Sequence, residues 1–197
     1  MNFIGFDIET TGTLSHQDLI VEIAAVRFQG DQVQETYQSF IEIESAMPAQ
    51  ATAINGITDD MLKGQPSIQE VLTDFAAFCG SHLMVAHNAI FDFQFISRDI
   101  KKNQTPSPRG LVLDTYTLSK KVFPQMANYK LATLCDYLKI KGETFHRAKA
   151  DAVACGHLFL KILKQIPVKN QGDIIEFSER KPLKFPQEFQ EGQLSFF

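Results

Sequence analysis

The chain has 197 residues, enough for one full domain and a short additional segment. With 44% apolar and 21% charged residues, its composition is typical of a globular protein and argues against a fibrous or disordered chain. The net charge of -4 argues against a protein that coats duplex nucleic acid through a generally basic surface.

The first 43 residues have the pattern of strands. Three stretches rich in β-branched and aromatic residues follow one another, at Phe3–Glu9, Leu19–Phe28 and Val33–Ile43. Gly30 and Asp31 form a tight-turn signal between the second and the third. Since no helical pattern separates these stretches, the sequence predicts an antiparallel meander that opens the sheet.

Most of the remaining chain has a helical pattern. We expect short strands at Leu83–Ala86 and Leu111–Leu113, and helices at Ser67–Phe78, Ala89–Ile100, Thr115–Phe123, Leu131–Leu138 and Ala148–Ile166. A helix joins the two short strands. The predicted fold is therefore α/β, a mixed sheet of about five strands flanked by helices.

The chain changes character near residue 166. Beyond that point it is polar and is interrupted by Pro167, Pro182 and Pro186. We therefore expect a domain over residues 1–165 and an extended tail over residues 166–197.

Two observations predict a cytoplasmic protein without a membrane partner. No signal-peptide pattern opens the sequence, and nowhere do 18 apolar residues run together. The cysteines, Cys79, Cys135 and Cys155, lie in apolar helical stretches without paired spacing, as expected for buried thiols in a reducing compartment.

Positive charge is concentrated in one stretch. Between Tyr116 and Ala150 the chain carries seven Lys or Arg residues against two acids, a net charge of +5. This stretch is either a solvated helix face or a surface that contacts phosphates.

Two acids on the first strand are the clearest sign of chemistry. Asp7 and Glu9 are two residues apart, so in a strand both side chains point to one face. Carboxylates about 4 Å apart repel by roughly 4 kcal/mol at an effective dielectric constant near 20, and a hard divalent cation offsets this repulsion. The alternative is a strand end with two solvated acids, but the following Thr10, Thr11 and Gly12 favour the rim of a site.

Two further acids belong to predicted helices. Asp92 lies near the start of one, where the helix macrodipole by itself would favour an acid. Asp151 follows His146 by five residues, which on one continuous helix would separate them by about 140°. The two can share a site only if His146 lies on the loop before the helix. A histidine there suits proton abstraction at neutral pH.

These residues fall in three short segments, FDIETTG at Phe6–Gly12, HNAIFD at His87–Asp92 and HRAKAD at His146–Asp151. In order and separation the segments resemble the motifs of the DEDDh branch of the DnaQ-like 3′ to 5′ exonucleases. The resemblance covers residues 1 to about 165 and implies a ribonuclease H-like fold. Members of this family cleave from a free 3′ end and release nucleoside 5′-monophosphates.

The resemblance also implies a role for each acid. Two divalent metal ions, Mg²⁺ or Mn²⁺, are expected, and Asp7 would bridge them. Glu9 and Asp151 would bind the ion that holds the attacking water. Asp92 would support the second ion through water. His146 would be the general base. The implied substrate is a single-stranded or frayed DNA 3′ end. Since the resemblance extends to the proofreading epsilon subunit of bacterial DNA polymerase III, a DNA polymerase is a further expected partner.

Substrate contacts are implied as well. Residues 53–58 resemble the family loop whose apolar side chain wedges against the terminal bases, although members often have His at the position of Asn55. The candidate substrate-binding residues are Thr10, Thr11, Ile54, Asn55, His87 and Asn88. Two alternatives stay open: Ile54 as a core residue on a short helical turn, and His87 as a structural cap where a strand meets a helix.

The last five residues, Gln193, Leu194, Ser195, Phe196 and Phe197, resemble the peptide with which bacterial replication and repair proteins bind the sliding clamp. Phe196 departs from the usual Leu. An extended peptide can bury Leu and Phe anchors in a pocket of its partner. The alternative is that these aromatic residues fold back onto the domain.

Three other functions compete with DNA cleavage. RNA-trimming exonucleases of the ribonuclease T or oligoribonuclease type use the same fold and metals, but the clamp-like peptide favours DNA. A non-catalytic adaptor would not need the complete set of acids and His146. A haloacid-type phosphatase shares the Asp7 strand but wants Asp at the position of Glu9 and an immediate α/β order, which the predicted hairpin contradicts.

Overall fold

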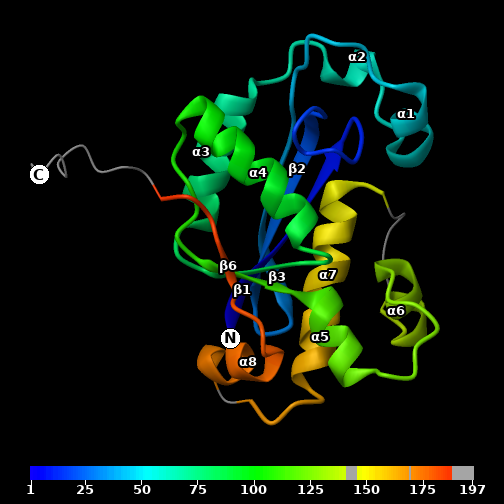
Figure 1. Ribbon diagram of the computed structural model, residues 1–197, viewed down its shortest axis with the longest axis vertical. Coiled ribbons are helices and arrows are strands. Elements are labelled where there is room, and N and C mark those ends of the chain that lie inside the picture. The colour runs from blue at the N-terminus through cyan, green and yellow to red at the C-terminus, as the bar shows by residue number, and fades with distance from the viewer. Residues whose placement is uncertain (141–145, 169, 188–197) are drawn as a thin grey trace, which may run out of the picture.

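The computed structural model describes residues 1–140, 146–168 and 170–187. Within these ranges the centre is a sheet of six strands in the order β3-β2-β1-β4-β5-β6 (Figure 1). The strands are β1 (Asn2–Thr10), β2 (Ile20–Gln29), β3 (Gln32–Phe40), β4 (Leu83–Ala86), β5 (Leu111–Asp114) and β6 (Leu183–Lys184). The first three form the predicted antiparallel meander, while β4 and β5 run parallel to β1. The predicted mixed sheet is confirmed, with one short strand more than expected.

Helices cover both faces of this sheet. The helices of the described ranges are α1 (Ala49–Asn55), α2 (Asp59–Leu62), α3 (Ile68–Cys79), α4 (Ile90–Asn103), α5 (Thr115–Val122), α6 (Leu131–Tyr137), α7 (Ala148–Leu163) and α8 (Gln171–Ser178). One face packs against α3 and α4, and the other against α7 with α5 and α6 (Figure 1). No helix in the described part of the chain is long and apolar enough to cross a bilayer.

The two faces of β1 have different chemistry. Toward α3 and α4 the strand presents the buried apolar side chains Ile4, Phe6 and Ile8. Toward α7 it presents Gly5, Asp7 and Glu9. A Cβ atom added at Gly5 would lie only 2.4 Å from the carbonyl oxygen of Ala152. Glycine therefore lets α7 lie against the strand backbone, which brings Asp151 beside Asp7.

The segment after residue 166 differs from the expected extended tail. Asn170 and Asp173 form a capping box that starts α8, and β6 pairs antiparallel with β5. Phe185 is 1% exposed and its ring packs on those of Phe6 and Phe93. The expectation is therefore corrected for residues 170–187, because one buried aromatic side chain and a cap hold this polar segment against the sheet. The clamp-like peptide at residues 193–197 lies outside the described residues.

Replacing Gly5 with Ala tests the close approach of α7. The new methyl group would meet backbone rather than a movable side chain, so the helix must shift. We expect Gly5→Ala to lower the free energy of unfolding by about 1–3 kcal/mol, as measured by urea denaturation. As a control, Gly172→Ala changes a glycine of α8 whose added Cβ atom would meet the side chain of Asn170 rather than backbone. Equal stability of Gly5→Ala and the native chain would show that α7 is not held by this contact.

Candidate metal centre

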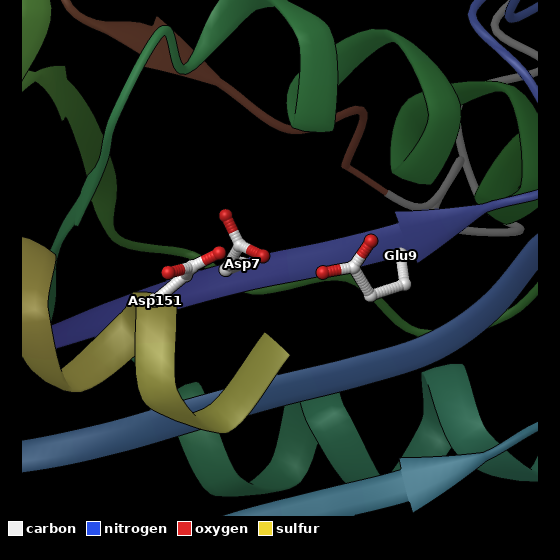
Figure 2. Close-up of side chains that lie close together, drawn as sticks. All are labelled: Asp7, Glu9 and Asp151. Carbon is white, nitrogen blue, oxygen red and sulfur yellow. The ribbon is translucent and has the colours of Figure 1, made fainter. Parts of the chain in front are cut away.

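Three acids from two elements meet at one point. Asp7 and Glu9 come from β1 and Asp151 from the first turn of α7, and one carboxylate oxygen of each lies within 4.8 Å of the others (Figure 2). Residues 144 positions apart in the sequence thus share a site. The structure brings these three acids together, as the sequence predicted.

Asp92 approaches the same strand from α4. It is 2% exposed, and its Oδ1 accepts a hydrogen bond of 3.1 Å from the backbone N–H of Ile8. Its charge raises the pKa of Asp7, so the two carboxyl groups are neighbours. Asp92 stands next to the cluster of three acids and is not one of its members.

The carboxyl groups of this site resist ionisation. Burial, followed by the charge of Asp151, raises the pKa of Glu9 to about 8. Burial also raises the pKa of Asp92 to about 8, and the pKa values of Asp7 and Asp151 are raised for the same first reason. Oδ1 of Asp151 is buried without a hydrogen-bond partner in the described part of the chain. The nearby charges of Arg147 and His146 only partly offset this, since they lower the pKa values of Glu9 and Asp151 that remain raised. An oxygen-only group of such acids is suited to hard divalent cations.

His146 lies on the loop before α7, as its spacing from Asp151 required. Its backbone has a φ of 67°, and its N–H donates a 3.0 Å hydrogen bond to Oδ2 of Asp151. The residue is exposed. The backbone of His146 thus orients one metal-ligand candidate, while the residue itself is open to solvent.

The turn after β1 is held by its own polar groups. The hydroxyl of Thr10 donates to the carbonyl of Gly12 at 2.5 Å, and that of Thr11 accepts from the N–H of Leu19 at 2.9 Å. These bonds give the two hydroxyls a structural role at the rim. They lend no support to the prediction that Thr10 and Thr11 contact substrate.

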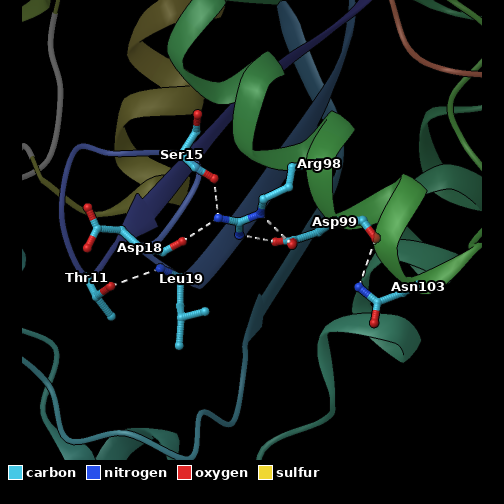
Figure 3. Close-up of polar contacts among 7 residues, drawn as sticks. All are labelled: Thr11, Ser15, Asp18, Leu19, Arg98, Asp99 and Asn103. Atoms are coloured by element: carbon cyan, nitrogen blue, oxygen red, sulfur yellow. Dashed lines mark hydrogen bonds and ion pairs between the residues drawn. The ribbon is translucent and has the colours of Figure 1, made fainter.

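Arg98 ties this turn to α4. Its guanidinium group donates to the carbonyl oxygens of Ser15 and Asp18 and forms a two-point ion pair with Asp99 (Figure 3). The helix that supplies Asp92 is therefore fixed to the turn that follows Glu9.

The predicted substrate loop corresponds to the end of α1 and the turn after it. Ile54 is 63% exposed, which is incompatible with the core position considered for it. Asn55 is buried, and its amide donates to the carbonyl of Thr10 at 3.4 Å and lowers the pKa of Glu9 by a hydrogen bond. Asn55 therefore supports an acid of the site, and Ile54 is free to meet a ligand.

The structure favours the structural role for His87. Its Nε2 lies 2.7 Å from the carbonyl oxygen of Tyr129 and its Nδ1 3.0 Å from the hydroxyl of Thr115, so both ring nitrogens are engaged. Burial lowers its pKa, which favours the neutral ring. These contacts support the alternative in which His87 is a structural cap, and its role in substrate binding stays a prediction. Asn88 is exposed, and its backbone N–H donates to Asp114.

Sequence reasoning missed Glu22. This glutamate lies opposite Glu9 on β2 and is fully buried. Its carboxylate accepts hydrogen bonds from the guanidinium of Arg147, at 3.1 and 3.2 Å, from the backbone N–H of Ala148 at 3.2 Å and from the amide of Gln38 at 2.6 Å. Glu22 anchors the start of α7, and hence Asp151, to the sheet. A lone acid inside the apolar run LIVEIAAV was the available signal.

The raised pKa values predict how stability depends on pH. Between the ordinary pKa of Glu9, 4.5, and its value of about 8 in the fold, the folded state binds more protons than the unfolded state. From Glu9 alone, the free energy of unfolding therefore falls as pH rises through this range, by roughly 2 kcal/mol between pH 6 and pH 8, and Asp92 changes it in the same direction. Mg²⁺ or Mn²⁺ should raise the melting temperature more at pH 8 than at pH 6. A free energy of unfolding in EDTA that is the same at pH 6 and pH 8 would contradict this prediction.

Glu22→Ala tests the anchor of α7. It leaves a guanidinium group and a helix N–H without their acceptor, so we expect a stability loss of about 3 kcal/mol and a 10- to 100-fold weaker affinity for Mn²⁺ by calorimetry. Glu22→Gln keeps hydrogen-bond capacity and should lose less of both. Exposed Glu44 gives the matched control, Glu44→Ala. A Glu22→Ala protein with native affinity for Mn²⁺ would remove Glu22 from the support of the site.

Known proteins with similar sequences include bacterial DNA polymerases III of the PolC type. DNA polymerase III PolC-type of Bacillus cereus is 38% identical over 164 residues, which cover 83% of this chain and 11% of that protein. The corresponding protein of Bacillus subtilis is 35% identical over 168 residues, covering 85% and 12%. The chain thus spans about a ninth of the length of these relatives.

Solved structures with a similar fold are exonucleases. A complex of exonuclease X with 5′ overhanging duplex DNA superposes with a TM-score of 0.69 and 26% identity, over 85% of this chain and 94% of that chain. E. coli exonuclease I in complex with a dT13 oligonucleotide gives a TM-score of 0.73 at 17% identity, over 89% and 43%, a likeness of fold alone. The Exonuclease family model (RNase_T) matches residues 4–159. The chain belongs to this exonuclease family, which confirms the predicted membership in the DnaQ-like 3′ to 5′ exonucleases.

Proposed function

We propose that this chain is a metal-dependent exonuclease that hydrolyses DNA from its 3′ end to nucleoside 5′-monophosphates. The observation that carries the proposal is the group of Asp7, Glu9 and Asp151, whose oxygens lie within 4.8 Å of one another. Oδ1 of Asp151, which has no hydrogen-bond partner among the described residues, supports it, because a bound cation would satisfy that atom.

In this proposal Asp7, Glu9 and Asp151, with Asp92 beside them, hold two divalent ions, Mg²⁺ or Mn²⁺. When bound, such a pair stabilises negative charge on the attacking and leaving oxygens of a phosphodiester. His146 acts as the general base: its loop position leaves the imidazole exposed, while its backbone is fixed to Asp151.

The exposed residues around the acids suit a strand end. Ile54 on α1 presents an apolar side chain to solvent, which can wedge against a terminal base. Asn88 lies exposed before α4, four residues from Asp92. Both are proposed to contact the terminal nucleotides, and Asn55 to act through Glu9.

The comparisons favour DNA over RNA. The polymerase relatives are named for DNA synthesis, and the exonuclease X and exonuclease I structures are complexes with DNA. We therefore assign the activity to proofreading or repair, next to a DNA polymerase. Clamp binding by residues 193–197 stays a prediction from the sequence.

The proposal is tested with a 5′-labelled single-stranded DNA oligonucleotide and its RNA counterpart. We expect stepwise shortening of the DNA from its 3′ end in Mg²⁺ or Mn²⁺, none in EDTA, and release of 5′-monophosphates. Asp7→Asn should lower the rate by about 10³-fold or more, and His146→Ala by roughly 10²- to 10⁴-fold. Asp31→Asn, at an exposed acid on a turn, is the matched control.

RNA trimming and a non-catalytic adaptor would each give a different result. Faster shortening of the RNA strand would replace DNA hydrolysis with RNA trimming. Native protein without nuclease activity in any divalent metal, and an Asp7→Asn variant identical to it, would indicate the adaptor.

A further inference from the structure

A groove of about 670 Å³ opens beside the candidate metal centre. It begins at Asn88 and Ile90, at the start of α4, runs past the end of β5 and the start of α5, and ends at the segment that joins α8 to β6. The segment 178–183 that forms its far wall belongs to the part of the chain for which the sequence predicted an extended tail. Folding of that segment therefore creates the groove.

The groove is basic although the whole protein is acidic. Four cations line it, Lys120, Lys121, Arg180 and Lys181, against two acids, Asp114 and Glu179. Both acids are engaged: Asp114 accepts hydrogen bonds from backbone N–H groups at the starts of α4 and α5, and Glu179 pairs with Lys121 at 2.9 Å.

Three of the cations are available to a ligand. Lys120, Arg180 and Lys181 are exposed, and within the described ranges they form no ion pair with an acid. The basic stretch between residues 116 and 150 contributes to this groove only in part, because Arg147 is bound to Glu22 and Lys139 lines a different cavity. The basic stretch therefore supplies only Lys120 and Lys121 to the groove, and the segment after α8 supplies Arg180 and Lys181.

An aromatic ring lies among these charges. Tyr116 lines the groove, and its ring is held edge-on by those of His87 and Tyr129, at centroid distances of 5.8 and 6.0 Å. Nζ of Lys120 lies 5.5 Å from the ring centroid. A fixed aromatic ring among cations is the combination that binds single-stranded nucleic acid without reading its sequence.

The groove is adjacent to the acids. Asn88, at its near end, is four residues before Asp92, and the charge of Asp114 contributes to the raised pKa of Asp92. A strand whose terminal phosphodiester lies at the acids can therefore continue into the groove.

We infer that this groove binds the nucleotides on the 5′ side of the strand end, with Lys120, Arg180 and Lys181 contacting phosphates and Tyr116 stacking on a base. The inference rests on the proposed nuclease function. Such a groove would provide an otherwise acidic protein with a local binding surface for a polyanion. The affinity for DNA should then depend on the length of the strand.

The test compares native protein with the triple variant Lys120→Ala/Arg180→Ala/Lys181→Ala. Binding of a fluorescent single-stranded DNA of about 16 nucleotides, the upper end of known site sizes for one single-strand-binding fold, is measured by anisotropy in EDTA. We expect affinity to fall about tenfold or more, and the slope of log affinity against log salt to fall by about 2, since each lost contact to a single strand removes about 0.7. The matched control, Lys101→Ala/Lys102→Ala/Lys161→Ala, removes three exposed charges elsewhere and should keep native binding.

Hydrolysis separates this inference from the proposed function. With Mg²⁺, the triple variant should cleave a dinucleotide as fast as native protein and the long strand with a higher KM. If native protein cleaves DNA but the triple variant binds the long strand as tightly as native protein does, the inference about the groove is wrong. The proposed nuclease function is then unaffected. If the triple variant loses binding to poly-glutamate but not to DNA, the inference about the groove is also wrong. The groove would then bind an acidic protein partner. Absence of hydrolysis by native protein overturns the function itself.

Discussion

The mutual repulsion of closely spaced, half-buried carboxylates is the constraint around which this site is organised. Asp7, Glu9 and Asp151 lie within ligand distance of one another, and Asp92 adds a fourth charge nearby. An isolated peptide would separate such groups in water, so the surrounding structure must hold them together at a cost in stability. That cost is also what makes the site receptive to cations, because each bound positive charge relieves it.

Two contacts away from the acids hold them together. Gly5 allows α7 to touch the backbone of β1, and Glu22 fixes the first turn of that helix through Arg147 and Ala148. Both act on the rigid elements that carry the metal-ligand candidates. The groups expected to meet substrate, such as His146 and Ile54, lie instead on a loop and at the exposed end of a short helix. The acids are therefore carried by rigid elements, while the residues proposed to meet substrate are exposed around them.

Local patterns made the meander, the alternation along β1 and the loop position of His146 predictable from the sequence. What remained hidden depends on contacts between distant residues. Burial of Phe185 against Phe6 cannot be read from a polar segment with prolines, and the engagement of His87 by Tyr129 requires the fold. Glu22 was missed because an acid within an apolar strand carries no sign of its partner on another element.

The central claim is that these acids jointly hold divalent metal ions, and a crystal structure with Mn²⁺ tests it most directly. The account predicts anomalous density for manganese between the carboxylates of Asp7, Glu9 and Asp151, at oxygen distances of about 2.0–2.2 Å, and its loss in Asp7→Asn. Well-ordered acids without manganese at saturating concentration, or manganese bound only at other surface groups, would contradict it.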